Sequence, residues 1–236
     1  MTTMFDDFTP ADLQLHADEH PVFRDIQKEA LEFFVYSEKR FVGGMLWPGS
    51  GKSLLAMAIA RATGLRTCIL TGKKGLQDQY CSSFSQHGLV DIRGRENYPC
   101  YGLKHMQTAG EVNCKDGPNL GCNLTQGAGC TYEIAKGIAK EADIIVTSYS
   151  YWLTVQDKAQ GIERTGKDRD IAGPNPIECL ILDEADMAVD IVGDYLGCRL
   201  TEKEVSKYGD DPMGELVPEW QDWSKGVAIE VKEEIA

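Results

Sequence analysis

The chain has no apolar run approaching the ~20 residues that a helix needs to cross a bilayer. Its first ten residues contain Asp6 and Asp7 and no Lys or Arg, whereas a secretory signal begins with positive charge. Glycine and proline, 24 and 9 of 236 residues, are too few for a fibrous or disordered chain. These absences predict a globular, cytoplasmic protein without a membrane partner.

Positive charge is also scarce, because 24 Lys and Arg stand against 37 Asp and Glu, for a net charge of −13. Such a balance argues against a protein that coats a phosphate backbone. The excess is concentrated in residues 177–236, where 5 basic residues stand against 16 acidic ones. Residues 1–104 carry 12 of each sign. A nucleic-acid groove on that first part of the chain is therefore compatible with the composition.

Eight cysteines in 236 residues are too dilute for a small disulfide scaffold, and cytosolic thiols stay reduced. Four of them fall in residues 91–131, a segment with seven Gly and no sustained apolar period. It is far longer than the ~4 to 6 residues of a usual connection. Metal ligation is the predicted means of holding this segment, since it cannot form a core of its own.

Runs of β-branched and aliphatic residues alternate with helical stretches along the chain. Strands are predicted at residues 41–46, 66–71, 143–147 and 178–182, and helices at 52–63 and 75–87. Strands separated by helices pair in parallel. The sequence therefore predicts an α/β domain with a parallel sheet flanked by helices.

A glycine loop follows the first predicted strand and precedes the helix at 52–63. Its sequence, Gly49-Ser50-Gly51-Lys52-Ser53, has the strand, loop, Lys-Ser and helix order of a phosphate-binding P-loop. Backbone N–H groups turn toward phosphate oxygens, Lys52 reaches the β and γ phosphates, and Ser53 can ligate Mg²⁺. Leu46 stands where the full pattern has its first glycine. The loop predicts a site for ATP and Mg²⁺.

Two acidic residues follow the predicted strand at 178–182. Asp183 can hold Mg²⁺ through water, and Glu184 can orient and deprotonate an attacking water. These two residues and Lys52 are the predicted catalytic residues. Gln27, upstream of the glycine loop, offers the donor and acceptor that match the Hoogsteen edge of adenine.

The glycine loop, the tetrad Asp183-Glu184-Ala185-Asp186 and Gln27 together resemble the first motor domain of a superfamily 2 helicase. Residues 69–79 look like that family's motif Ia. Residues 93–100 and 142–151 resemble the two flanks of the cysteine insertion in its XPD/DinG-type branch, which includes phage-encoded members. That branch more often ends the tetrad in His. The resemblance, over roughly residues 20–200, implies a RecA-like P-loop NTPase domain.

The same resemblance implies the domain organisation. Residues 1–95 and 140–192 form the RecA-like domain, 96–135 the cysteine-rich metal-binding insertion, and 193–236 the start of a helical Arch-like insertion or a tail. Four cysteines of that branch bind a 4Fe-4S cluster, and the matching residues here are Cys100, Cys114, Cys122 and Cys130. Zinc stays an alternative, although the spacings include no Cys-x-x-Cys pair.

The implied activity is that of an ATP-dependent DNA helicase that moves 5′ to 3′ on single-stranded or forked DNA. DNA contacts are expected from Lys73, Lys74, Gln77, Arg93 and Arg95, and base stacking from Tyr98, Tyr101, Tyr149 and Trp152. A second RecA-like domain is expected from a missing C-terminal part or another chain. Without that domain, the chain is expected to bind nucleotide weakly and to unwind nothing.

Two other classes remain open. One is a non-helicase P-loop ATPase or kinase in which the cysteine segment is a zinc-bound lid. The other is a non-catalytic DNA-binding remnant. DNA-stimulated ATP hydrolysis separates the three, because a kinase ignores DNA and a remnant hydrolyses nothing.

Overall fold

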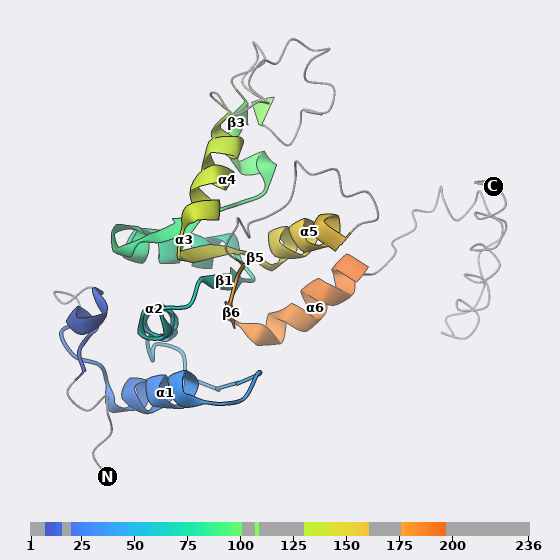
Figure 1. The fold of residues 1–236 in the computed structure, drawn as a ribbon. Helices are drawn as coiled ribbons and strands as arrows, with labels where there is room; N and C mark the ends of the chain where they lie inside the picture. The colour runs from blue at the N-terminus through green and yellow to red at the C-terminus, as the bar shows by residue number, and fades with distance from the viewer. Residues whose placement is uncertain (1–7, 16–19, 101–106, 109–129, 161–175, 197–236) are drawn as a thin grey trace, which may run out of the picture. The chain divides into compact units, whose positions relative to one another are not determined.

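The computed structural model describes residues 8–15, 20–100, 107–108, 130–160 and 176–196, drawn in colour in Figure 1. The chain divides into two compact units, Met1–Tyr195 and Leu196–Ala236, and the description below concerns the first. A parallel sheet with the strand order β2-β5-β1-β6 lies at its centre. The four strands are β1 (Thr67–Thr71), β2 (Leu89–Asp91), β5 (Ile144–Ser148) and β6 (Cys179–Leu182). The predicted α/β class with a parallel sheet is confirmed.

The described residues form six α-helices, of which α1 packs on α2, and two short strands that pair apart from the sheet. The helices are α1 (Asp25–Tyr36), α2 (Lys52–Thr63), α3 (Lys74–Phe84), α4 (Thr131–Glu141), α5 (Tyr149–Gln160) and α6 (Ala185–Leu196). Single 3-10 turns are η1 (Pro10–Leu13), η2 (Ser85–His87) and η3 (Arg95–Asn97). The antiparallel pair is β3 (Pro99–Cys100) with β4 (Gln107–Thr108). Helix α2 ends at Gly64, whose left-handed φ of 62° lets its N–H bond back to Ala60.

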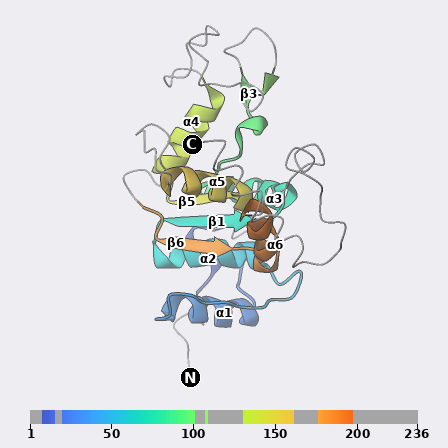
Figure 2. The ribbon, with the colours of Figure 1, turned by 90° about the vertical axis from the view of Figure 1, so that its right-hand side faces the viewer.

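Side chains of the central strands alternate between two cores. Ile69 of β1 packs in a core with residues of α1, α2 and α3, whereas Cys68 and Leu70 pack in a second core with residues of α4 and α5. Burial on both faces explains why β1 is an unbroken apolar run rather than an alternating one. Figure 2 shows β1 and β6 side by side and pointing the same way. Their carboxyl ends therefore share one edge of the sheet.

The strand predicted at residues 41–46 does not form, and that prediction is wrong. The segment is extended but outside the sheet, and Phe41 and Met45 are 83% and 98% exposed. An apolar, β-branched run shows that a segment suits a strand, but pairing also requires a free neighbouring strand edge, which composition does not specify. Conversely β2, with the three residues Leu-Val-Asp, is too short to give a pattern.

Several predicted regions lie outside the described residues. Cys114 and Cys122, most of the predicted insertion at 96–135, and residues 197–236 belong to them. The insertion as a folded unit therefore stays a prediction. Among the residues that are described, no helix is both long and apolar enough to cross a membrane.

Candidate functional site

The acidic half of the candidate site begins where β6 ends. The backbone N–H of Asp183 donates to the carbonyl of Leu70 at 3.0 Å, so this residue continues the pairing of β6 with β1. Its carboxylate, 9% exposed, accepts a 2.8 Å bond from the Tyr80 hydroxyl on Oδ2 and a 3.0 Å bond from the Glu184 N–H on Oδ1. Tyr149 donates to the Asp183 carbonyl at 3.0 Å. Both the backbone and the side chain of Asp183 are thus fixed.

Glu184 has an unusual backbone conformation. Its φ of 53° lies in the left-handed region, which a non-glycine residue adopts at an energetic cost. Its Oε2 atom is buried and has no hydrogen-bond partner among the described residues. A carboxylate oxygen in this state has full capacity to accept a bond from water or another donor.

The glycine loop forms the other half of the site. Gly49 and Gly51 have φ values of 77° and 82°, a conformation that favours glycine at both positions. Two residues at the start of α1 form hydrogen bonds with the loop. Gln27 Nε2 donates to the Ser50 carbonyl and Arg24 Nη1 donates to the Gly49 carbonyl, both at 2.7 Å. Ser50 Oγ is buried without a hydrogen-bond partner in the described part of the chain.

Both ends of the Gln27 amide, which was predicted to contact adenine, are hydrogen-bonded within the protein. Its Oε1 accepts from the Arg24 N–H at 2.9 Å, while its Nε2 is bonded to Ser50. A Cβ placed on Gly51 would approach Gln27 Nε2 to 2.3 Å, so a larger residue at position 51 would displace this amide. Gln27 therefore braces the loop in this structure, and its contact with adenine stays a prediction.

Tyr80 supports the acidic half from α3. Burial is the main cause that raises the pKa of Tyr80 well above its ordinary value; the Asp183 carboxylate raises it further, and a hydrogen bond with Ser53 lowers it. The phenol thus keeps its proton and donates it to Asp183. The hydroxyl thus has Asp183, directly after β6, as its hydrogen-bond partner, and Ser53 of α2 is among the groups that influence its pKa. Lys52, the first residue of α2, precedes Ser53 directly.

Tyr149 supports the acidic half from the start of α5, directly after β5. It is the first residue of α5 and is buried. Burial, followed by the Asp183 carboxylate, raises the pKa of Tyr149 to about 12. The predicted stacking of this ring on a base is not supported, because the ring lies inside the domain and its hydroxyl is used by Asp183.

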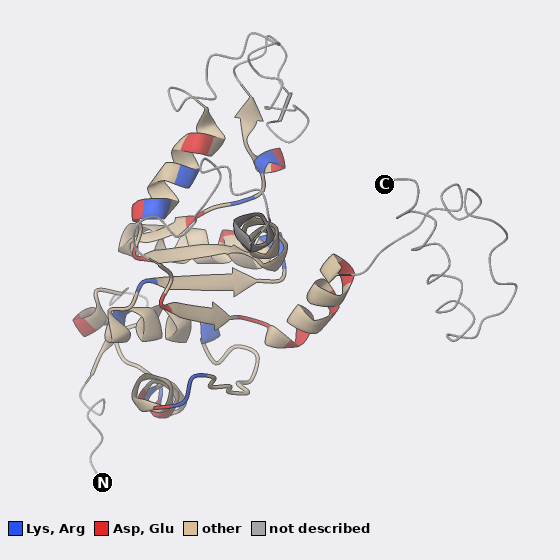
Figure 3. Cartoon of the chain, turned by 45° about the vertical axis from the view of Figure 1, so that its right-hand side comes forward, with Lys and Arg blue, Asp and Glu red and all other residues tan. Residues whose placement is uncertain are grey.

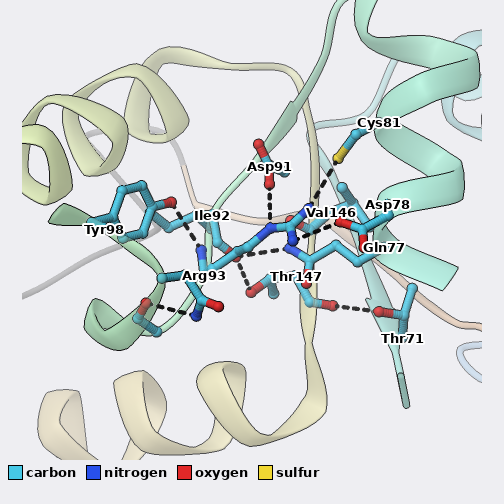
Figure 4. Close-up of polar contacts among 12 residues, drawn as sticks. Thr71, Gln77, Asp78, Cys81, Asp91, Ile92, Arg93, Tyr98, Val146 and Thr147 are labelled. Atoms are coloured by element: carbon cyan, nitrogen blue, oxygen red, sulfur yellow. Dashed lines mark hydrogen bonds and ion pairs between the residues drawn. The ribbon is translucent and has the colours of Figure 1, made fainter. Parts of the chain in front are cut away.

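The predicted DNA contacts separate into exposed and buried residues. Lys73 and Lys74 are exposed at the start of α3, on the sheet edge that carries Asp183. Gln77, 1% exposed, donates from Nε2 to the carbonyls of Ile92 at 3.2 Å and Val146 at 3.4 Å (Figure 4). Its predicted backbone contact is therefore not supported, since an amide so enclosed is not available to a strand.

Arg93 is also engaged inside the protein. Its guanidinium forms 2.7 Å ion pairs with Asp78 and Asp91, and Nη2 lies 3.8 Å from Cys81 Sγ (Figure 4). These contacts join α3 to the end of β2, so the predicted DNA contact of Arg93 is not supported in this arrangement. Arg95 is less enclosed, and its guanidinium carbon lies 5.8 Å from the ring centroid of Tyr132.

The two flanks of the predicted insertion meet. Thr131 Oγ1 donates to the Pro99 carbonyl at 2.9 Å, and the rings of Tyr98 and Tyr132 contact edge to face at 5.5 Å between centroids. These residues adjoin Cys100 and Cys130, which are half-buried free thiols. The first and last predicted ligands are therefore neighbours, while Cys114 and Cys122 are not described. Within the described ranges, no group of three or more His, Cys, Asp or Glu could hold a metal ion.

Charge is unevenly distributed around the site. Helix α6, which follows Glu184, carries Asp186, Asp190 and Asp194 and no Lys or Arg (Figure 3). A negatively charged helix repels phosphates, so a nucleic-acid strand is better accommodated beside Lys73 and Lys74.

Sequence reasoning did not find Tyr80 or Arg24, and it assigned Tyr149 to base stacking rather than to the support of Asp183. Only the helical spacing of Tyr80 and Phe84 hinted that this face of α3 points inward, and no pattern named the partner of either hydroxyl. Comparison with models of known protein families and with curated proteins found no match to this chain.

Proposed function

We propose that the chain is the ATP-binding motor domain of an ATP-dependent DNA helicase with a RecA-like fold. The observation that carries the proposal is the Asp183 carboxylate, fixed by the Tyr80 hydroxyl and the Glu184 N–H at the carboxyl end of β6, together with the glycine loop that leads into Lys52 at the start of α2. A glycine loop alone is a weak signal, whereas a glycine loop together with a fixed acidic strand end is the arrangement that nucleotide hydrolysis requires.

The residues present fit Mg²⁺ and a nucleotide. Ser53 and Asp183 supply hard oxygen ligands, which Mg²⁺ prefers. Ser50 Oγ and Glu184 Oε2 are buried polar atoms without partners in the described structure, as expected for groups that bind a ligand or water. When bound, Mg²⁺ neutralises charge on the phosphates.

Each residue then has a distinct task. The Gly49–Ser53 segment surrounds phosphate oxygens with backbone N–H groups, and Lys52 places its charge on the β and γ phosphates. Asp183 orients water on the metal, and Glu184 accepts a proton from the attacking water. Gln27 and Arg24 keep the loop open by holding two of its carbonyls.

Single-stranded DNA is proposed to bind at the sheet edge that carries Lys73 and Lys74, with Arg95 nearer the cysteine segment. Gln77 and Arg93 contribute indirectly, because the buried bonds of Gln77 and the ion pairs of Arg93 fix α3 against β5 and the end of β2. Translocation needs a second RecA-like domain, from a further part of the polypeptide or another chain, and the proposed direction is 5′ to 3′.

The cysteine segment is proposed to hold a 4Fe-4S cluster through Cys100, Cys114, Cys122 and Cys130, and the closed base between Pro99 and Thr131 supports this reading. Iron and acid-labile sulfide analysis after anaerobic purification tests it. We expect about four of each per chain. Cys100→Ser should lose both, whereas the control Cys81→Ser should keep them. Stoichiometric zinc without sulfide would establish the zinc-bound lid instead.

DNA-stimulated ATP hydrolysis tests the whole proposal. The chain is assayed together with the remainder of its natural polypeptide, with and without single-stranded DNA, and Glu184→Gln serves as the hydrolysis-deficient variant. A helicase motor should hydrolyse ATP faster when DNA is present. Hydrolysis that ignores DNA indicates a P-loop ATPase or kinase, and DNA binding without nucleotide binding indicates a non-catalytic remnant.

A further inference from the structure

Tyr80 lies at the centre of the candidate site although no sequence motif includes it. It is on the second turn of the eleven-residue helix α3, and its side chain is fully buried. The ring packs at a tilt against Phe84, with 6.1 Å between the ring centroids. A buried Tyr needs a partner for its hydroxyl, and here the partner is a carboxylate rather than a backbone carbonyl.

The two oxygens of the Asp183 carboxylate are held by two different elements. Oδ2 accepts from Tyr80 on α3 at 2.8 Å, and Oδ1 accepts from the Glu184 N–H at 3.0 Å. Two bonds on different oxygens fix the rotation of the carboxylate about its Cβ–Cγ bond. Each oxygen keeps accepting capacity, because an ionised carboxylate has about four lone-pair sites.

The orientation of this carboxylate affects Mg²⁺ affinity, because Asp183 is proposed to contact the metal through a bound water. Mg²⁺ gives up its waters reluctantly and demands near-ideal octahedral geometry, so an acid that binds its hydration shell must be placed in advance. Groups that orient such an acid tune metal affinity without touching the metal. Ser53, the second predicted ligand, also influences this hydroxyl, because it lowers the pKa of Tyr80.

We infer that Tyr80 is a positioning residue for the metal site, whose hydroxyl sets the orientation of the Asp183 carboxylate. The inference rests on the proposed nucleotide site. It differs from a purely structural role, in which the ring fills the core between the sheet and α2 and the hydroxyl merely satisfies its own bonding requirement.

The test is calorimetric titration of the chain, together with the remainder of its natural polypeptide, with ATP in Mg²⁺ and in EDTA, for wild type, Tyr80→Phe and Tyr80→Leu. Tyr80→Phe keeps the ring and removes the hydroxyl. It should leave ATP affinity in EDTA within about twofold of wild type and reduce the Mg²⁺-dependent gain in affinity about tenfold. Tyr80→Leu should show the same loss of Mg²⁺ dependence and, in addition, a lower urea midpoint, because it also loses ring packing.

Tyr98→Phe is the matched control, because it removes the phenol that accepts from the Arg93 N–H at 3.2 Å, away from both predicted ligands. It should keep the full Mg²⁺ dependence. In an Asp183→Asn background, Tyr80→Phe should cause no further loss of the Mg²⁺-dependent gain in ATP affinity. This comparison is a second test, made between two variants that both lack the Asp183 charge.

The outcomes are separable. A Tyr80→Phe variant with unchanged Mg²⁺ dependence beside a weakened Tyr80→Leu variant would mean that packing alone explains Tyr80, and the inference would be overturned. Wild-type protein that binds no ATP would overturn the proposed nucleotide site, and this inference with it. Wild-type binding with a selective Tyr80→Phe defect supports both.

Discussion

The acidic half and the loop half of the candidate site are supported in different ways. Asp183 continues the pairing of β6 with β1 and is enclosed, with donors from α3 and from its own chain neighbour fixing its carboxylate. The glycine loop instead follows the exposed segment that includes Met45, and in the described structure the side chains of Gln27 and Arg24 support it. One half is part of the sheet, and the other is attached to α1.

The difference suits the ligands that each half is proposed to bind. A metal ligand must be placed in advance, whereas a phosphate loop wraps around its ligand with backbone N–H groups. Gln27 and Arg24 bind loop carbonyls, which phosphate does not use. Substitutions in the acidic half should therefore change the metal dependence of nucleotide binding, and substitutions in the loop half should change nucleotide binding with or without metal.

Asp183→Asn is expected to give the largest difference between its effect on ATP affinity in Mg²⁺ and its effect in EDTA. Loss of the charge should reduce the Mg²⁺-dependent gain in ATP affinity about 100-fold, while ATP affinity in EDTA is retained. Calorimetry in Mg²⁺ and in EDTA measures both quantities. Asp190→Asn, on the exposed side of α6, is the matched control and should behave as wild type. Equal losses of ATP affinity in Mg²⁺ and in EDTA would show that Asp183 does not act through the metal, which contradicts the proposed difference between the two halves.

Gln27→Ala should act on the loop half. It leaves the Ser50 carbonyl and the Arg24 N–H without this partner, which should lower the free energy of unfolding by ~1–3 kcal/mol. ATP affinity should fall about tenfold in both Mg²⁺ and EDTA, since a 1.4 kcal/mol cost of ordering the loop is a factor of ten. Urea unfolding and calorimetry measure the two effects. Gln79→Ala, an exposed glutamine on α3, should change neither.

The smallest effect is expected at the shared sheet edge. Lys73→Ala combined with Lys74→Ala should weaken single-stranded DNA binding roughly threefold at moderate salt. The slope of log affinity against log salt should become less negative by about 1.4, because each contact to a single strand contributes about 0.7. Fluorescence anisotropy at several salt concentrations measures this slope. Lys39→Ala with Arg40→Ala removes the same charge elsewhere, and an equal change there would mean that no local DNA contact exists.

Much of the sheet could be predicted because buried parallel strands are recognisable as continuous apolar runs. The structure has strands Thr67–Thr71, Ile144–Ser148 and Cys179–Leu182, each within a residue of the prediction, and the helix predicted at 52–63 matches α2. The same signal failed at 41–46, because a run of suitable residues does not say which strand edge is free to pair.

The site was only partly predictable. Local order placed Ser53 at the start of a helix and Asp183 at a strand end, but the bond of Asp183 with Tyr80 is a tertiary feature with no local signature. Gln77 and Arg93 were predicted to face DNA from their polar or basic character and from the resemblance of residues 69–79 and 93–100 to helicase segments. Helical spacing gave a contrary signal for Gln77, because residues 77, 80 and 84 share one face of α3 and that face is buried.

The central claim is that the glycine loop and Asp183 form one Mg²⁺-dependent ATP site, and titration of Lys52→Ala with ATP in Mg²⁺ tests it most directly. Wild type should bind, Lys52→Ala should show no measurable binding because the phosphates lose their main cationic partner, and the exposed-lysine control Lys74→Ala should bind as wild type. Lys52→Ala protein that is folded, by its near-ultraviolet circular dichroism, and binds ATP with wild-type affinity would contradict the account.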